Sequence, residues 1–120
     1  MDPISVAIVA ALTKLTDTAI RDGYEALKSL LKRRFGTGKG VVEAVSDLEK
    51  EPASAGRREV LREKVAASGA DRDEEILRAA EALTEKVQAL PGGQQVVHQI
   101  VTGHRNLIVG IGNINTPGTG

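Results

Sequence analysis

The charged residues of this chain stop abruptly near residue 90, and this boundary limits what the chain can fold into. All sixteen acidic residues and fifteen of the sixteen lysines and arginines precede Leu90, and the sixteenth is Arg105. The stretch Gln94–Asn115, QQVVHQIVTGHRNLIVGIGNIN, is rich in Val, Ile, Gln, Asn and Gly. This composition is typical of segments that pair with copies of themselves as β-strands. The predicted segments are a helical domain over residues 1–90, a Pro/Gly hinge over 91–93, a self-assembly motif over 94–116 and a flexible end over 117–120.

Apolar residues before this boundary recur at three- and four-residue spacing, which predicts helices. The first helix is expected to start at Asp2-Pro3, an N-cap and a first-turn proline, and to run to Gly36 with a weak point at Gly23. Three shorter helices with short loops complete an all-α, four-helix bundle followed by a flexible tail that can form cross-β amyloid. The positions expected to be buried in the last three helices are Val41, Val42, Val45, Leu48, Val60, Leu61, Val65, Ile76, Ala80, Leu83, Val87 and Leu90.

The start of the first helix is more apolar than an amphipathic helix requires. From Ile4 to Leu12 every residue except Ser5 is apolar. One interpretation is a helix end that its neighbours bury on most sides, and the other is a segment that can enter a lipid bilayer. It is too short to span a bilayer, which takes about 20 apolar residues, so membrane action would need oligomers or shallow insertion. The candidate membrane-active residues are Ile4, Val6, Ile8, Val9 and Leu12.

The composition argues against several classes of function. The chain has no cysteine, which excludes thiolate metal sites, and its zero net charge argues against nucleic-acid binding by bulk electrostatics. The glycine-rich loop Gly36–Gly40 lacks the Ser or Thr that a phosphate-binding loop places after its lysine. No catalytic constellation, cofactor site or metal site is expected, so the protein is predicted not to be an enzyme. Without a basic region or a cleavage site at the N-terminus, a cytoplasmic location is expected.

The tail contains two G-x-x-N units nine residues apart, Gly103–Asn106 and Gly112–Asn115. A repeat of this kind is compatible with two stacked strand-turn layers, with apolar side chains inside and asparagine ladders along a fibril axis. The residues expected to form the amyloid core are Gln99, Ile100, Gly103, Asn106, Val109, Gly110, Ile111, Gly112, Asn113 and Asn115.

The second unit resembles the core of the RIP homotypic interaction motif of animal necroptosis, aliphatic-Gln-aliphatic-Gly-x-x-Asn. Val109, Ile111, Gly112 and Asn115 match it, whereas Gly110 stands where that family has Gln. Three segments of the helical domain carry a second resemblance: DPISVAIVAAL, YEALKSLLKRRFG and EVLREKVAASGADRDEEILRAA. With them, the whole chain resembles the bacterial Bell-domain proteins that carry a C-terminal amyloid signalling sequence, and these are similar to the fungal HeLo-type domains.

The resemblance implies a cell-death effector of a bacterial NLR-type immune pathway. A receptor with a matching N-terminal motif would template the tail into amyloid, and the crowded bundles would release the first helix toward lipids of the inner membrane. Two alternatives remain open from the residues. In one, the bundle is a non-lytic adaptor brought to a signalling filament; in the other, the tail is a β-hairpin or a fifth element packed on the bundle, with no assembly.

Overall fold

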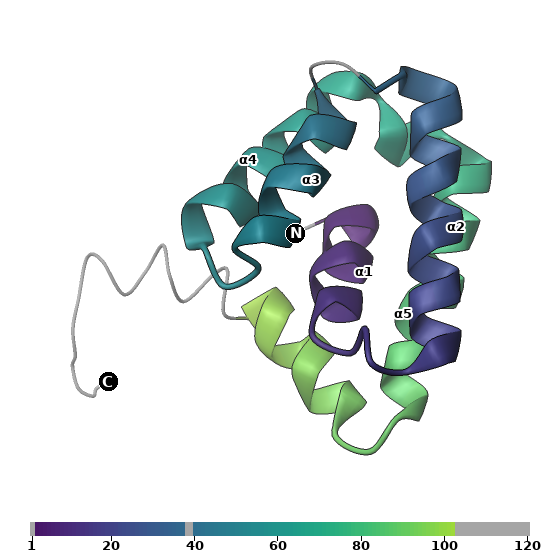
Figure 1. The fold of residues 1–120 in the computed structure, drawn as a ribbon, viewed down its shortest axis with the longest axis vertical. Helices are drawn as coiled ribbons and strands as arrows, with labels where there is room; N and C mark the ends of the chain where they lie inside the picture. The colour runs from purple at the N-terminus through teal and green to yellow at the C-terminus, as the bar shows by residue number, and fades with distance from the viewer. Residues whose placement is uncertain (1, 38–39, 103–120) are drawn as a thin grey trace.

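The computed structural model describes residues 2–37 and 40–102, and the described part is helical throughout its regular elements (Figure 1). We call the helix over residues 93–102 the C-terminal helix. The other elements are α1 (Pro3–Leu12), α2 (Thr18–Phe35), α3 (Val41–Lys50), α4 (Ala55–Ser68), the 3₁₀ helix η1 (Ala70–Arg72) and α5 (Glu74–Ala89). The prediction of an all-α bundle is confirmed.

Short polar side chains and glycines set the helix ends. Asp2, Ser54 and Asp73 are N-caps whose side chains accept hydrogen bonds from backbone amides in the first turns of α1, α4 and α5. Gly36 and Gly69 end α2 and α4 with φ of 78° and 82°, a region that glycine adopts without strain. These caps give short loops, which fold consecutive helices back on one another.

The long first helix of the prediction is wrong, because the structure divides it into α1 and α2. Thr13 follows α1, and its Oγ1 donates a 2.7 Å hydrogen bond to the carbonyl oxygen of Ala10. Four residues later the Asp17 carboxylate accepts from the amide of Ile20 at 3.1 Å and so caps α2. The break lets α2 turn back, so that α1 lies between α2 and the α3–α4 pair in the view of Figure 1.

The core is aliphatic and has α1 in it. α1 packs most extensively against α5 and also contacts α4, α2 and η1. The predicted positions of α3 and α5 are buried, with Leu90 only partly so, whereas Val60 in α4 is 42% exposed and was wrongly placed in the core. Leu61 and Val65, on the opposite face of α4, are the residues that point inward.

Gly23 allows α2 and α5 to approach closely. A Cβ at this position would lie 3.1 Å from Cδ1 of Leu83 in α5, tighter than almost all real Cβ contacts. The residue that the sequence marks as a weak point is therefore a packing position, and α2 continues through it without a break.

Candidate functional site at the first and C-terminal helices

α1 is buried over all of its length except its two end residues, Pro3 and Leu12. Each residue from Ile4 to Ala11 is at most 6% exposed, and only Leu12 among the candidate membrane-active residues is partly exposed. Ser5, the one buried polar residue of the described chain, has its polar atoms satisfied by Asp2, which accepts from both the Ser5 amide and the Ser5 hydroxyl at 2.8 Å. α1 is thus an apolar helix whose buried polar side chain is hydrogen-bonded to the N-cap residue of the same helix.

The burial of α1 sets the free energy that any release must overcome. Full burial of a Val or Ile side chain stabilises by roughly 1.5–3 kcal/mol, so Ile4, Val6, Ile8 and Val9 together contribute about 6–12 kcal/mol. That is comparable to the whole stability of a small domain, about 5–15 kcal/mol. Spontaneous exposure of α1 in the folded monomer is therefore rare, and release requires an opposing source of free energy.

The C-terminal helix begins at a backbone approach that only glycine permits. A Cβ on Gly93 would lie 1.7 Å from the carbonyl oxygen of Val87 in α5, a distance that no side chain can occupy. The amide of Gly93 donates to the carbonyl of Leu90 at 2.9 Å, and Gly92, with φ of 77°, makes the turn before it. The predicted Pro/Gly hinge is thus a tight turn that folds the C-terminal helix against the end of α5.

Two apolar side chains anchor the C-terminal helix in the same core as α1. Val97 and Ile100 are 8% and 7% exposed, and Val96 packs beside them. Their spacing of three residues places them on one face of a helix. The packed domain therefore extends beyond the predicted limit at residue 90, and residues 93–102 correspond to the alternative of a further element packed on the bundle.

The predicted amyloid core falls partly on this helix and partly outside the described residues. Gln99 is exposed on the C-terminal helix and Ile100 is buried beneath it. The remaining core residues lie outside the described part of the chain: Gly103, Asn106, Val109, Gly110, Ile111, Gly112, Asn113 and Asn115. The segment with β-strand composition is thus continuous with a helix that packs in the core.

A shallow groove follows the seam between α1 and α5. Its volume is about 310 Å³, and its lining residues are Pro3, Val6, Glu81, Thr84, Glu85 and Gln88. The helices described over residues 2–37 and 40–102 include none with the length and hydropathy of a membrane span. The same residues hold no group of three or more His, Asp or Glu side chains placed to bind a metal ion.

A partly buried polar contact fastens α2 to α3. The Tyr24 hydroxyl donates to the Glu49 carboxylate at 2.5 Å, and the Lys28 ammonium pairs with the same oxygen at 2.7 Å. Burial alone would raise the pKa of Glu49, but the hydrogen bonds from Lys28 and Tyr24 outweigh it and hold this pKa below its ordinary value. Burial, followed by the bond to Glu49, raises the pKa of Tyr24 well above its usual range.

The raised pKa of Tyr24 predicts a loss of stability at alkaline pH. An unfolded tyrosine ionises near pH 10, so stability is complete below that pH and falls as the pH rises above it. Tyr24 is the only tyrosine and the chain has no tryptophan, so absorbance at 295 nm follows this one group. We expect tyrosinate absorbance to appear together with the loss of helical circular dichroism. Tyr24→Phe should lower the free energy of unfolding by roughly 1–3 kcal/mol at pH 7. The stability of this variant should then fall less steeply above pH 10 than that of the wild type. Tyrosinate absorbance near pH 10 with full helicity would contradict the buried contact.

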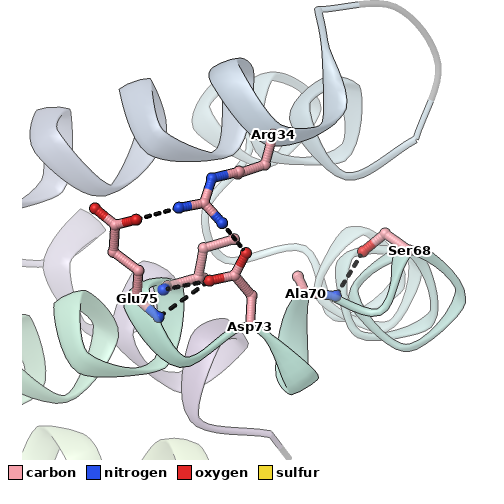
Figure 2. A network of polar contacts seen from close by, with 6 residues as sticks. Arg34, Ser68, Ala70, Asp73 and Glu75 are labelled. Atoms are coloured by element: carbon pink, nitrogen blue, oxygen red, sulfur yellow. Dashed lines mark hydrogen bonds and ion pairs between the residues drawn. The ribbon is translucent and has the colours of Figure 1, made fainter.

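A second polar network joins the end of α2 to the start of α5 (Figure 2). Arg34 pairs with Asp73 through one nitrogen and with Glu75 through another. Asp73 also caps α5, since its Oδ1 accepts from the amides of Glu75 and Ile76 at 3.0 and 3.2 Å. Exposed ion pairs contribute about 0–1 kcal/mol each, so this network orients the two helices more than it stabilises them.

The comparison with protein families covers nearly the whole chain. The model of the Het-E N-terminal domain matches residues 1–118, which include α1, the C-terminal helix and most of the tail. No curated protein and no solved structure matches the chain. The chain therefore belongs to the Het-E N-terminal domain family, a HeLo-like family associated with NLR-type cell-death signalling in fungi.

Proposed function

We propose that this protein is a bacterial cell-death effector of the Bell type, whose RHIM-like tail is templated into amyloid by an NLR-type receptor and whose bundle then disrupts the inner membrane. The observation that carries the proposal is the continuity between the C-terminal helix and the tail. Ile100 belongs both to the core that encloses α1 and to the predicted amyloid core. One segment cannot be a packed helix and a cross-β strand at the same time.

This continuity supplies a route from assembly to the bundle. If cross-β structure extends back to Gln99 and Ile100, the C-terminal helix loses its anchor and the core loses Ile100 and Val97. Removing each such side chain from a core costs roughly 2–5 kcal/mol for Ile and less for Val. Templated growth of a cross-β fibril, with every backbone group paired, provides a free energy large enough to offset that loss.

The dimensions of α1 determine how it could act on lipid. Ten helical residues are about 15 Å long, half of the roughly 30 Å hydrocarbon core. A released α1 would therefore insert shallowly or act in groups, with Ile4, Val6, Ile8, Val9 and Leu12 as the lipid-facing residues. The protein would be cytoplasmic before activation and would move to the inner membrane once its tails assemble. Its partners would be further copies of itself, the receptor's matching motif and membrane lipids.

A single isosteric change in the tail tests the assembly step. Asn115→Asp places a carboxylate on every chain of the fibril, and with two stacked layers per chain these carboxylates are about 9.6 Å apart, which costs about 0.4 kcal/mol per neighbouring pair at the dielectric of water and more in a dry interior. We expect full-length Asn115→Asp to lose thioflavin-positive fibrils and dye leakage from phosphatidylethanolamine–phosphatidylglycerol vesicles at pH 7. Protonation below the ordinary aspartate pKa, about 3.9, should restore assembly.

Thr119→Asp is the matched control, because it adds the same charge beyond the 94–116 segment. It should assemble and leak like the wild type. Equal assembly of Asn115→Asp and wild type at pH 7 would remove Asn115 from an ordered core. Absence of fibrils from the wild type, even with preformed fibrils of the tail peptide as seeds, would overturn the amyloid proposal.

The second candidate function is a non-lytic adaptor recruited to a signalling filament. The complete burial of α1 favours it, since burial by neighbouring helices explains the apolar sequence without any membrane role. The two candidates differ in one result. Fibrils that form normally but leave vesicles and cells intact would support the adaptor and exclude the lytic effector.

A further inference from the structure

The groove between α1 and α5 carries two carboxylates that no described neighbouring residue pairs with. Glu81 and Glu85 stand four residues apart on its rim, both exposed, and neither has a hydrogen bond or an ion pair within the described chain. Like charges at this spacing oppose helix stability, and a cation from outside would relieve the opposition. Pro3 and Val6 provide an apolar floor beside them. An acidic rim over an apolar floor suits Lys and Arg, whose alkyl stems cover apolar surface while their charged ends meet carboxylates.

The last turn of α2 presents the complementary group. Lys32 and Arg33 are both exposed there. Arg33 has no partner among the described residues, and Lys32 acts only at a distance on Glu49. Arg34, in contrast, forms ion pairs with Asp73 and Glu75.

The two surfaces lie at different levels of the bundle. Arg34 fixes the end of α2 to the first turn of α5, and Glu81 and Glu85 lie six and ten residues beyond Glu75 on the same helix. At 1.5 Å per residue, they are about 9 and 15 Å further along α5. Lys32 acts on Glu49 of α3 instead. A contact between the groove of one copy and the α2 end of another is heterologous, so repetition produces an open row or a ring.

We propose that the groove between α1 and α5 binds the Lys32–Arg33 end of α2 from a second copy of this chain. The inference rests on the proposed assembly of the tails, which crowds the bundles. Each chain adds only about 4.8 Å per strand layer to a fibril, whereas the bundle is 26 Å across in its smallest dimension. Neighbouring bundles are therefore forced together. The contact lies on the seam that holds α1, so an assembled row acts directly on the helix whose release the function requires.

Charge reversal on each side, followed by mixing, tests the contact in the full-length protein. Zero-length carbodiimide cross-linking should join Lys32 to Glu81 or Glu85 between isotopically distinct copies, in assembled samples and in concentrated soluble protein. Glu81→Lys with Glu85→Lys, or Lys32→Glu with Arg33→Glu, should each reduce the dimer fraction in sedimentation velocity, which needs no reactive pair, about tenfold or more, because like charges then face each other. An equimolar mixture of the two variants should restore it, since every contact between unlike variants pairs opposite charges. Raising the salt to 1 M, where the Debye length is about 3 Å, should weaken the wild-type contact.

Lys50→Glu with Lys64→Glu is the matched control, because it changes the net charge equally at exposed positions of α3 and α4. It should leave the dimer unchanged. A dimer fraction that stays at the wild-type level in both reversed variants would overturn the proposed contact. So would a mixture whose dimer fraction stays as low as those of its two components. Thioflavin fluorescence of the same samples distinguishes failure of the proposed groove contact from failure of the proposed amyloid function. Normal fibrils with charge-independent cross-links reject the contact alone, whereas charge-dependent dimers without fibrils reject the amyloid step alone.

Discussion

The double variant Ile8→Asp, Val9→Asp will fail to fold. Both side chains are 1% exposed at the centre of the core, so each substitution buries a carboxylate without a partner. Such a change costs at least about 4 kcal/mol, and two of them, at least about 8 kcal/mol, are comparable to the whole stability of a small domain, about 5–15 kcal/mol. Circular dichroism should show little helix at 25 °C and no cooperative thermal transition. Loss of cell killing by this variant would therefore report on folding and would carry no information about membrane insertion.

Ala26→Asp is the matched control for the unfolding prediction. Ala26 is exposed in the middle of α2, so the same carboxylate costs only the difference in helix propensity, under about 1 kcal/mol. Ile8→Ala should lie between the two, with a loss of about 2–5 kcal/mol from the cavity that it leaves. A cooperative transition for the double variant within a few degrees of the wild type would mean that α1 is not enclosed as the structure places it.

Gly93→Ala will detach the C-terminal helix while leaving the rest of the bundle folded. The added Cβ would lie 1.7 Å from the Val87 carbonyl oxygen, so the backbone of one or the other must move. Overpacking of this kind costs about 1–3 kcal/mol, which raises the open fraction of this ten-residue helix, anchored chiefly by Val97 and Ile100. Hydrogen exchange of residues 94–102 should accelerate about tenfold or more, and seeded fibril growth should show a shorter lag.

Gly56→Ala provides the comparison, since a Cβ on Gly56 would meet only the Ser54 hydroxyl at 3.9 Å. Alanine also has the higher helix propensity, so stability and exchange in residues 94–102 should be unchanged or slightly improved. If Gly93→Ala exchanges like Gly56→Ala, the turn at residues 90–93 is not the constraint that holds the C-terminal helix. Faster exchange without faster assembly would instead separate the undocking of this helix from the growth of the fibril.

Local signals in the sequence predict most of the bundle. The spacing of Ile76, Ala80, Leu83 and Val87 identifies the buried face of α5, because a helix places residues three and four apart on one side. Asp73 and Gly69 mark where helices begin and end, because capping depends on one side chain or one φ angle. The excess of apolar residues in Ile4–Leu12 leaves burial and membrane insertion both open, and the structure shows Ile4–Ala11 buried.

The incorrect predictions concern features that depend on tertiary contacts or on competing side-chain hydrogen bonds. Val60 satisfies the helical period, yet the direction in which α4 meets the core exposes it and buries Leu61. The break after Leu12 depends on the competition of Thr13 and Asp17 side chains for backbone groups. In the C-terminal helix, Val and Ile favour strands locally, but burial of Val97 and Ile100 in the core of the same chain outweighs that preference. Their three-residue spacing was the available signal.

A reversible lock on α1 tests the central claim most directly. The chain has no cysteine, so Val6→Cys with Thr84→Cys, two positions that line the same groove, leaves one pair of thiols to join α1 to α5, and mass spectrometry before the assay selects the protein in which the disulfide has formed. The oxidised protein should form thioflavin-positive fibrils like the wild type and leave phosphatidylethanolamine–phosphatidylglycerol vesicles intact, and a reductant added to the same fibrils should start dye leakage. The single-cysteine variants should leak without reductant. Equal leakage from the oxidised and reduced double variant would contradict the account, because the membrane would then be disrupted with α1 still held in the bundle.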